Sequence, residues 1–473
     1  MLHPLLDRAT STRRAATARA AAASDLAPRL ARTADLAAHT GCVNTVAWID
    51  GGDRLVTGSD DRTVAVWRVG GGAGAAVEWR AQTAHRANVF QARFLGASEL
   101  ATCSADGQVH LYPFGAAGPP GGGARGGDGA PPPHRLLFAH AGRAHKMALA
   151  PDSPPTTLYT VGEDGQFAMV DVRAAPGSPA AGVAFAGRSR GGRVPVALFA
   201  VAVDPTRPHL VAVGGEACLG RVLDVRALAA GGAGAARGGA TAAAFLPEHL
   251  ARAGRRAASL AVTGLAYDCA GRLLASYNGD AAYLFPAGAA ARGAGGPAPG
   301  ASRAMPPDEN SSDDGDECGP GSPAASGVPF DARAPGDDAA PGPDGLRRFC
   351  GAINVRTVKG AAFLDAHGDH VACGSDDGKF YVWATATSRL RAARGADADV
   401  VNIVAPHPAA PMTLATCGID DTVKLWAPVG ERVAAPDGAA AAAAGAMPGG
   451  AFGWDDGSDE EGSSTDGSAG EGG

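Results

Sequence analysis

The chain has 473 residues, of which 45% are hydrophobic and 19% charged, and its formal net charge is −7. No window of about 18 consecutive apolar residues occurs, so the sequence predicts no membrane-spanning helix. Residues 304–345 carry a net charge of −9 and residues 433–473 of −8, whereas the body of the chain is mildly basic. Because this body has no dense stripe of Lys and Arg, we expect protein partners rather than nucleic acid.

The first 36 residues are rich in Ala and Arg and form an N-terminal arm in this interpretation. The segment 12–23 is typical of a helix, and 25–39 predicts a second short helix that Pro28 breaks. The same composition also resembles that of an organelle transit peptide, and the sequence leaves this alternative open.

A repeated unit begins after the arm. Residues 55–67, LVTGSDDRTVAVW, consist of an apolar pair, small residues, an acidic turn and alternating β-branched residues that lead to a Trp. This pattern predicts two short strands joined by a tight turn. The same register returns six times, at 99–112, 157–173, 209–226, 272–285, 370–383 and 413–426. A spacing near the ~40–45 residues of a WD40-type blade predicts an all-β, seven-bladed WD40-type β-propeller over residues 37–430.

Each of the first three repeats is preceded by a His that we expect to bond with the turn Asp and, through a Ser or Thr, with the closing Trp. In the first repeat the candidates are His39, Thr57 or Ser59, Asp61 and Trp67. Such a chain of donors and acceptors stabilises a blade when every member is satisfied, so we assign these residues a structural role. The corresponding residues predicted for the other blades are His85, Asp106, His140, Asp164, Asp377, Trp383, Asp420 and Trp426.

Three low-complexity stretches, 115–133, 227–257 and 287–345, each follow the strand that ends at the Trp-equivalent position. We expect all three to leave the same rim of the propeller as disordered loops, and 431–473 to form an acidic disordered tail. Long loops are tolerated there, because loop closure costs only ~0.6 kcal/mol per doubling of length.

The sequence contains no convincing catalytic or cofactor-binding motif. The segment GGEACLG, residues 214–220, lacks the Lys of a phosphate loop, and the twelve His lack metal-ligand spacing. We therefore predict a protein that is not an enzyme and needs no cofactor or metal. The eight Cys include no C-x-x-C pair. Together with the lack of a secretory signal, this favours a reducing compartment, the nucleus, the cytoplasm or both.

Two repeats share an ending that the others lack. The third and fourth repeats end in VDVR and LDVR, which gives Asp171-x-Arg173 and Asp224-x-Arg226. Both arginines follow the third strand of adjacent blades, so we expect them to project side by side on one face. Arg is suited to bidentate pairing with a partner's carboxylate, although each Arg could instead pair with its own neighbouring acid.

The chain resembles the WD-repeat substrate receptors of cullin-4 RING ubiquitin ligases, the cullin-4-associated factors, and among them factor eight of the series. The matching segments lie between Leu36 and Pro428 and include HTGCVNTVAW, NVFQARF, TCSADGQVHLY, AHKMALAPDSP, VGEDGQF, LLASYNGDAAYLF, NVRTVKG, GSDDGKFYVW, VVNIVAPHP and ATCGIDDTVKLWAP.

The resemblance implies a function and a docking site. In that family the Asp-x-Arg ends dock the receptor onto the cullin's adaptor, a multi-propeller protein, with help from an N-terminal helical segment. By position this implicates Arg173 and Arg226, with Asp171 and Asp224 orienting them, and residues 24–38 as the helical contact. The implied function is a non-catalytic receptor that presents an unidentified protein substrate for ubiquitination. The alternative is a ligase-independent scaffold, such as a chromatin or histone-binding protein.

Overall fold

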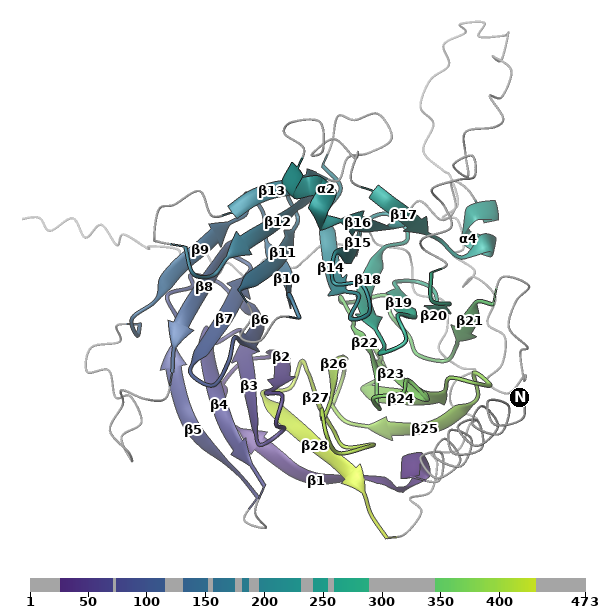
Figure 1. Ribbon diagram of the computed structural model, residues 1–473. Coiled ribbons are helices and arrows are strands. Elements are labelled where there is room, and N and C mark those ends of the chain that lie inside the picture. Colours follow the sequence, from purple (N-terminus) through teal and green to yellow (C-terminus); the bar gives the residue numbers. More distant parts are fainter. Residues whose placement is uncertain are drawn as a thin grey trace, which may run out of the picture.

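A computed structural model describes the protein over residues 26–70, 74–114, 131–151, 156–174, 181–186, 195–230, 241–253, 259–288 and 345–430. It consists of seven four-stranded antiparallel sheets arranged as blades around a central axis (Figure 1). The predicted all-β, seven-bladed propeller is therefore confirmed.

Blades one to six each use four strands that are consecutive in the chain, running from the innermost to the outermost. Blades one, two and three comprise β2 (Val43–Trp48), β3 (Arg54–Ser59), β4 (Thr63–Val69) and β5 (Ala75–Gln82); β6 (Val89–Phe94), β7 (Glu99–Ser104), β8 (Gln108–Pro113) and β9 (Arg135–Ala139); and β10 (Ala144–Leu149), β11 (Thr157–Gly162), β12 (Gln166–Asp171) and β13 (Ala181–Ala186). Blades four, five and six comprise β14 (Leu198–Val203), β15 (Leu210–Gly215), β16 (Gly220–Asp224) and β17 (Thr241–Phe245); β18 (Val262–Tyr267), β19 (Leu273–Tyr277), β20 (Ala282–Phe285) and β21 (Arg347–Phe349); and β22 (Ala361–Phe363), β23 (His370–Gly374), β24 (Lys379–Ala384) and β25 (Leu390–Gly395).

Blade seven joins the two ends of the described chain. Its inner strands are β26 (Val401–Pro406), β27 (Leu414–Gly418) and β28 (Thr422–Pro428), and its outermost strand is β1 (Leu30–Ala37), which follows the short 3-10 helix η1 (Ala27–Arg29). β1 pairs antiparallel with β28 from Leu30 opposite Pro428 to Ala37 opposite Thr422. This pairing closes the ring.

The closing strand corrects two predictions. The helix expected over 25–39, and with it a helical contact at 24–38, is wrong, because residues 30–37 form a strand. The boundary between arm and propeller at residue 36 is wrong for the same reason. The helix expected at 12–23 lies outside the described residues.

The turn between the second and third strands of a blade needs a left-handed backbone. Gly107, Gly165 and Gly378 take positive φ there, and Arg62 takes φ 61° at the equivalent position of blade one. A Cβ on Gly107 would lie 2.6 Å from the backbone oxygen of His140 in the next blade. Glycine at this turn therefore permits both the conformation and the close approach of neighbouring blades.

The core consists of apolar clusters between adjacent blades. One cluster combines Cys103 and Val109 of blade two with Met147, Leu158 and Val170 of blade three. Cys103, Cys373 and Cys417 are buried and pack as compact apolar residues. The blades are thus held together by side chains that pack face to face.

The low-complexity stretches lie largely outside the described residues. Residues 115–130, 231–240, 289–344 and the tail 431–473 are not described. The prediction of a single loop over 227–257 is wrong, since this stretch contains β17 and the helix α4 (Glu248–Ala253). Residues 115–130, 231–240 and 289–344 each connect a third strand to a fourth, so these three connections belong to one rim, whereas α4 lies between β17 and the next innermost strand, β18.

Candidate docking surface and blade networks

Blade one contains a continuous hydrogen-bonded chain from its turn to its closing Trp. The Nδ1 of His39 lies 3.2 Å from Asp61 Oδ2, and its Nε2 lies 2.7 Å from Thr57 Oγ1. Trp67 Nε1 donates to the same Thr57 hydroxyl at 3.1 Å. Thr57, rather than Ser59, is thus the middle member. The side-chain nitrogens of His39 and Trp67 and the carboxylate of Asp61 all have hydrogen-bond partners.

Blades two and three contain shorter versions of this chain. His85 connects Asp106 at 3.2 Å with Thr102 at 2.7 Å, and His140 connects Asp164 at 3.0 Å with a Thr at 3.1 Å. Neither blade has a Trp at the far end. In blade two Tyr112 occupies the position of the Trp, and its hydroxyl accepts a hydrogen bond from the backbone N–H of Ala84 at 2.8 Å.

The hydroxyl of Thr57 pairs with two buried side-chain nitrogens, whereas that of Thr102 pairs with one. We expect Thr57→Val to lower the free energy of unfolding by about 3 kcal/mol, because it leaves both the His39 and Trp67 nitrogens unpaired. Thr102→Val leaves only the His85 nitrogen unpaired and should cost about half as much. Urea denaturation of the two variants checks this difference, and equal costs would contradict it.

The turn aspartates also make the stability of the fold depend on pH. Burial raises the pKa of Asp106, but hydrogen bonds from His85 and the Arg86 backbone outweigh it and hold this pKa at about 2. Asp61 and Asp164 have lowered pKa values for the same reason. An unfolded Asp titrates near ~3.9, so these groups stabilise the fold above about pH 4 and lose that contribution as the pH falls toward 2. Thermal unfolding followed from pH 6 to pH 2 should show this loss, and a smaller one in His85→Ala.

Blades six and seven use different partners at their turns. Asp377 accepts a hydrogen bond from Tyr381 Oη at 2.7 Å, since no His precedes this blade. Asp420 pairs with Lys424, whose Nζ lies 2.7 Å from Asp420 and 2.8 Å from Asp397. Trp426 Nε1 donates to Thr416 at 2.9 Å, and Trp383 Nε1 to the backbone oxygen of Cys350 at 3.0 Å. The Asp and the Trp of these two blades are thus bonded separately and not through one chain.

A second set of polar pairs joins the innermost strand to the first acidic residue of the same turn, and sequence reasoning did not identify it. The pairs occupy equivalent positions and are Asn44–Asp60 at 2.6 Å, His145–Glu163 at 3.0 Å and Lys359–Asp376. The partner of the acid differs among these three blades, being Asn, His or Lys. No single motif could therefore have shown them, although the paired acids at the turn are a signal in retrospect.

The two Asp-Val-Arg segments have the same geometry. In each, the Arg Nε and Nη2 donate to the two oxygens of the Asp, at 3.0 and 2.9 Å for Arg173 and at 3.0 and 2.8 Å for Arg226. The same Asp also accepts the backbone N–H of its Arg. Of the two uses considered for these arginines, pairing with the neighbouring acid is therefore the one seen within the chain.

This pairing leaves both guanidinium groups accessible. The Arg173 and Arg226 side chains are 68% and 67% exposed. The valines between Asp and Arg, Val172 and Val225, are buried in the core. Each segment is thus anchored by its Val and presents a preformed Asp–Arg pair to solvent.

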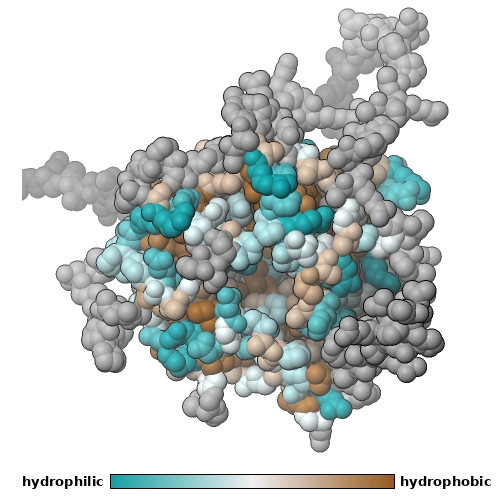
Figure 2. Space-filling model, in the orientation of Figure 1, coloured by the Kyte–Doolittle hydropathy of each residue, from teal (hydrophilic) through white to brown (hydrophobic). Residues whose placement is uncertain are grey.

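Neighbouring elements fix the position of these pairs. Arg226 lies in the helix α2 (Val225–Ala230), which contacts β13 of blade three. Figure 2 shows hydrophilic side chains over this helix on the face in view. Arg135 of β9 donates to the backbone oxygens of Val172 and Ala174, which ties blade two to the Asp-Val-Arg turn of blade three. The hydrogen bonds from Arg173 lower the pKa of Asp171 to about 2, so this carboxylate stays charged near neutral pH.

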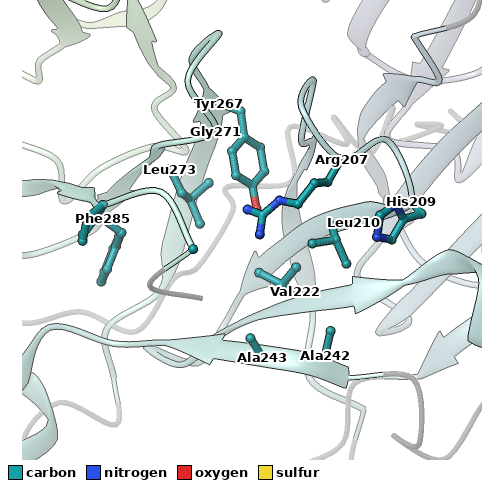
Figure 3. A pocket seen from close by; sticks show the side chains of 12 residues that line it. Arg207, His209, Leu210, Val222, Ala242, Ala243, Tyr267, Gly271, Leu273 and Phe285 are labelled. Atoms are coloured by element: carbon teal, nitrogen blue, oxygen red, sulfur yellow. The ribbon is translucent and has the colours of Figure 1, made fainter. Parts of the chain in front are cut away.

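An apolar pocket of about 290 Å³ lies at the same rim, between blades four and five. Leu210, Val222, Leu273 and Phe285 line it, and Arg207 and Tyr267 lie together at one side (Figure 3). The adjoining His209 accepts the N–H of Val225 through its backbone oxygen at 2.9 Å. The pocket is therefore next to the fourth-blade Asp-Val-Arg segment.

Within the described residues, no group of three or more His, Cys, Asp or Glu is arranged to hold a metal ion. No helix in this part of the chain is both long and apolar enough to cross a membrane.

Comparison with known proteins agrees with the fold. Residues 30–68 match the family described as "WD domain, G-beta repeat". The chain is 29% identical over 282 residues to the protein ALTERED SEED GERMINATION 2 of Arabidopsis thaliana, an alignment that covers 55% of this chain and 36% of the relative. It is 29% identical over 265 residues to DDB1- and CUL4-associated factor 6 of Homo sapiens, covering 54% of this chain and 28% of that protein.

A third similarity is shorter. Over 82 residues the chain is 40% identical to WD and tetratricopeptide repeats protein 1 of Homo sapiens, which covers 17% of this chain and 12% of the relative. The alignments thus cover between 12% and 36% of the length of these relatives. Among the cullin-4-associated factors this similarity is to factor 6, so it does not support the more specific expectation of factor eight. Fold and comparisons together show a seven-bladed propeller in which residues 30–68 match a WD40-repeat family model, and a chain that is similar over about half its length to a DDB1- and CUL4-associated factor.

Proposed function

We propose that this protein is a non-catalytic substrate receptor of a cullin-4 RING ubiquitin ligase. The rim with the two Asp-Val-Arg segments docks the ligase adaptor, and other surfaces of the propeller select a protein substrate. No cofactor enters this function, because the receptor acts by raising the effective concentration of the substrate near the ubiquitin-transfer machinery. Such a receptor works in the nucleus, the cytoplasm or both.

The observation that carries the proposal is the duplicated Asp-Val-Arg geometry. Arg173 and Arg226 lie at equivalent ends of adjacent blades, on buried valine anchors, with the same bidentate pairing to their own Asp. An Arg held in this way loses little conformational entropy on binding, and its exposed guanidinium suits carboxylate or carbonyl oxygens of a partner. The name of one relative, DDB1- and CUL4-associated factor 6, supports the ligase adaptor as that partner.

The test is binding of the full chain to the purified adaptor. Removal of one central Arg from an interface costs about 2 kcal/mol, which corresponds to roughly 30-fold in Kd. We expect Arg173→Ala and Arg226→Ala each to weaken binding by about this factor, and the double variant to abolish co-purification with cullin-4. Asp171→Asn should have a smaller effect, because it loosens the Arg without removing it.

A matched control comes from the opposite rim. Arg252 of α4 is 75% exposed and pairs with Glu248, so Arg252→Ala removes an exposed, ion-paired Arg away from the proposed interface. This variant should bind the adaptor like the wild type. Undiminished binding by the double variant would refute the docking assignment. Failure of the wild type to bind the adaptor, together with capture of histone tails, would instead favour the ligase-independent scaffold.

A further inference from the structure

One row of positions on the innermost strands is almost uniform around the ring. The strand registers place one residue per blade at this level, and six of the seven are alanine. The row consists of Ala47, Arg93, Ala148, Ala202, Ala266, Ala362 and Ala405. Blade two alone thus places a long, charged side chain where the other blades have a methyl group.

A neighbouring row contains a second cation. Two residues earlier, the registers of six innermost strands align Thr45, Gln91, Lys146, Ala200, Gly264 and Ile403, and in blade six this position is Gly360, directly before β22. Lys146 is the one charged residue in this row. It lies on β10 and Arg93 on β6, and these innermost strands of adjacent blades contact each other near the axis (Figure 1).

Among the described residues, neither cation has an acidic partner. Arg93 Nε is fully buried and makes no hydrogen bond, and no ion pair involves either side chain. Two fully buried lysines are different, since Lys359 pairs with Asp376 and Lys424 with Asp397 and Asp420. Buried charges in proteins are normally paired, and these two partly buried cations have no such counter-charge among the described residues.

The local electrostatics agree with this geometry. Burial lowers the pKa of both Arg93 and Lys146, and the charge of Arg93 lowers that of Lys146 further. Cys103 lies near both cations, but burial raises its pKa to about 12, so it stays a neutral thiol. Both cationic residues retain partial solvent exposure, which leaves them accessible to a small ligand.

We propose that Arg93 and Lys146 form a binding site for a small dianion of the phosphate class, inorganic phosphate or a phosphate monoester, close to the propeller axis. The planar guanidinium of Arg93 suits two oxygens of a phosphoryl group, and the Lys146 ammonium supplies the second positive charge. This site is separate from the Asp-Val-Arg rim and does not depend on the proposed ligase function.

The test is the thermal unfolding of the full chain in inorganic phosphate or glycerol phosphate, against chloride at equal ionic strength, with calorimetric titration of both ligands. We expect phosphate to raise the melting temperature of the wild type above its value in chloride. Arg93→Ala, which installs the residue found in the other six blades, and Lys146→Gln, which installs the counterpart of Gln91, should lose this increment and at least tenfold in affinity. Without phosphate, both variants should be at least as stable as the wild type.

Arg391→Ala is the control, because it removes an exposed cation from the outermost strand β25 and should keep the full phosphate increment. A stronger response to glycerol phosphate than to phosphate would assign the site to an ester, and the reverse to the free ion. The proposal is overturned if the wild type shows no phosphate-specific shift or if Arg93→Ala keeps it. It is equally overturned if a glutamate-rich peptide binds the wild type and phosphate does not.

Discussion

Deletion of residues 1–37 is expected to abolish the cooperative unfolding transition of the propeller. The deletion removes β1, which pairs along its length with β28 and contributes the outermost strand of blade seven. Leu30 and Leu36 are buried on this strand, and burial of each contributes about 2 kcal/mol. The lost hydrogen-bond ladder and the exposed edge of β28 add to this, so the total approaches the whole net stability of a folded domain, about 5–15 kcal/mol.

Point variants of β1 separate the contribution of its buried side chains from the loss of the whole strand. Leu30→Ala and Leu36→Ala should each cost about 3 kcal/mol in urea denaturation, because each leaves a cavity. Arg32→Ala removes a side chain that is 44% exposed and pairs only with the exposed Asp35, so it should change stability by less than about 0.5 kcal/mol. A deleted chain that still melts cooperatively at the wild-type temperature would show that the ring does not need this closure.

A second anchor of the closing segment comes from blade six. The buried Arg394 of β25 donates from Nε to the backbone oxygen of Leu30 at 3.0 Å and from Nη2 to that of Pro28 at 2.8 Å. These bonds hold the chain just before and at the start of β1, so the closing strand is fixed by two blades rather than one.

The closing strand also shows where sequence reasoning failed. Ala, Leu and Arg favour helix locally, and the strand that overrides this preference lies about 390 residues away in the sequence. A local pattern contains no information about such a partner. The outermost strand β17 was missed for a related reason, because TAAAF in an Ala-rich stretch has no alternation to mark it.

The repeats themselves were predictable, since each carries its own signal. The second and third strands alternate regularly and enclose an acidic or Gly-containing turn, so seven copies at similar spacing were enough to give the propeller. The chain from His39 to Trp67 followed from the same repeat. The inner pairs did not, because geometry recurs there while residue type changes.

The Lys359–Asp376 pair is the most deeply buried of these inner contacts. The two side chains are 0% and 4% exposed, and Lys359 Nζ also donates to Thr357 Oγ1 at 2.8 Å. Asp376 further accepts the backbone N–H groups of Val355 and Arg356. In blade one the equivalent residues are Asn44 and Asp60, which form a hydrogen bond at 2.6 Å without a cation.

We expect Asp376→Ala to lower the free energy of unfolding by about 3–5 kcal/mol, because it leaves the Lys359 ammonium buried without its counter-charge. The double variant Lys359→Met, Asp376→Ala should recover most of this loss, since no unpaired charge remains. Lys359→Asn recreates the residue pair of blade one and should cost clearly less than Asp376→Ala. Urea denaturation of these variants and of the single variant Lys359→Met gives the coupling between the two positions. If the free-energy losses of the two single variants simply added in the double variant, the loss would come from packing. An unpaired Lys359 charge would then not explain the effect of Asp376→Ala.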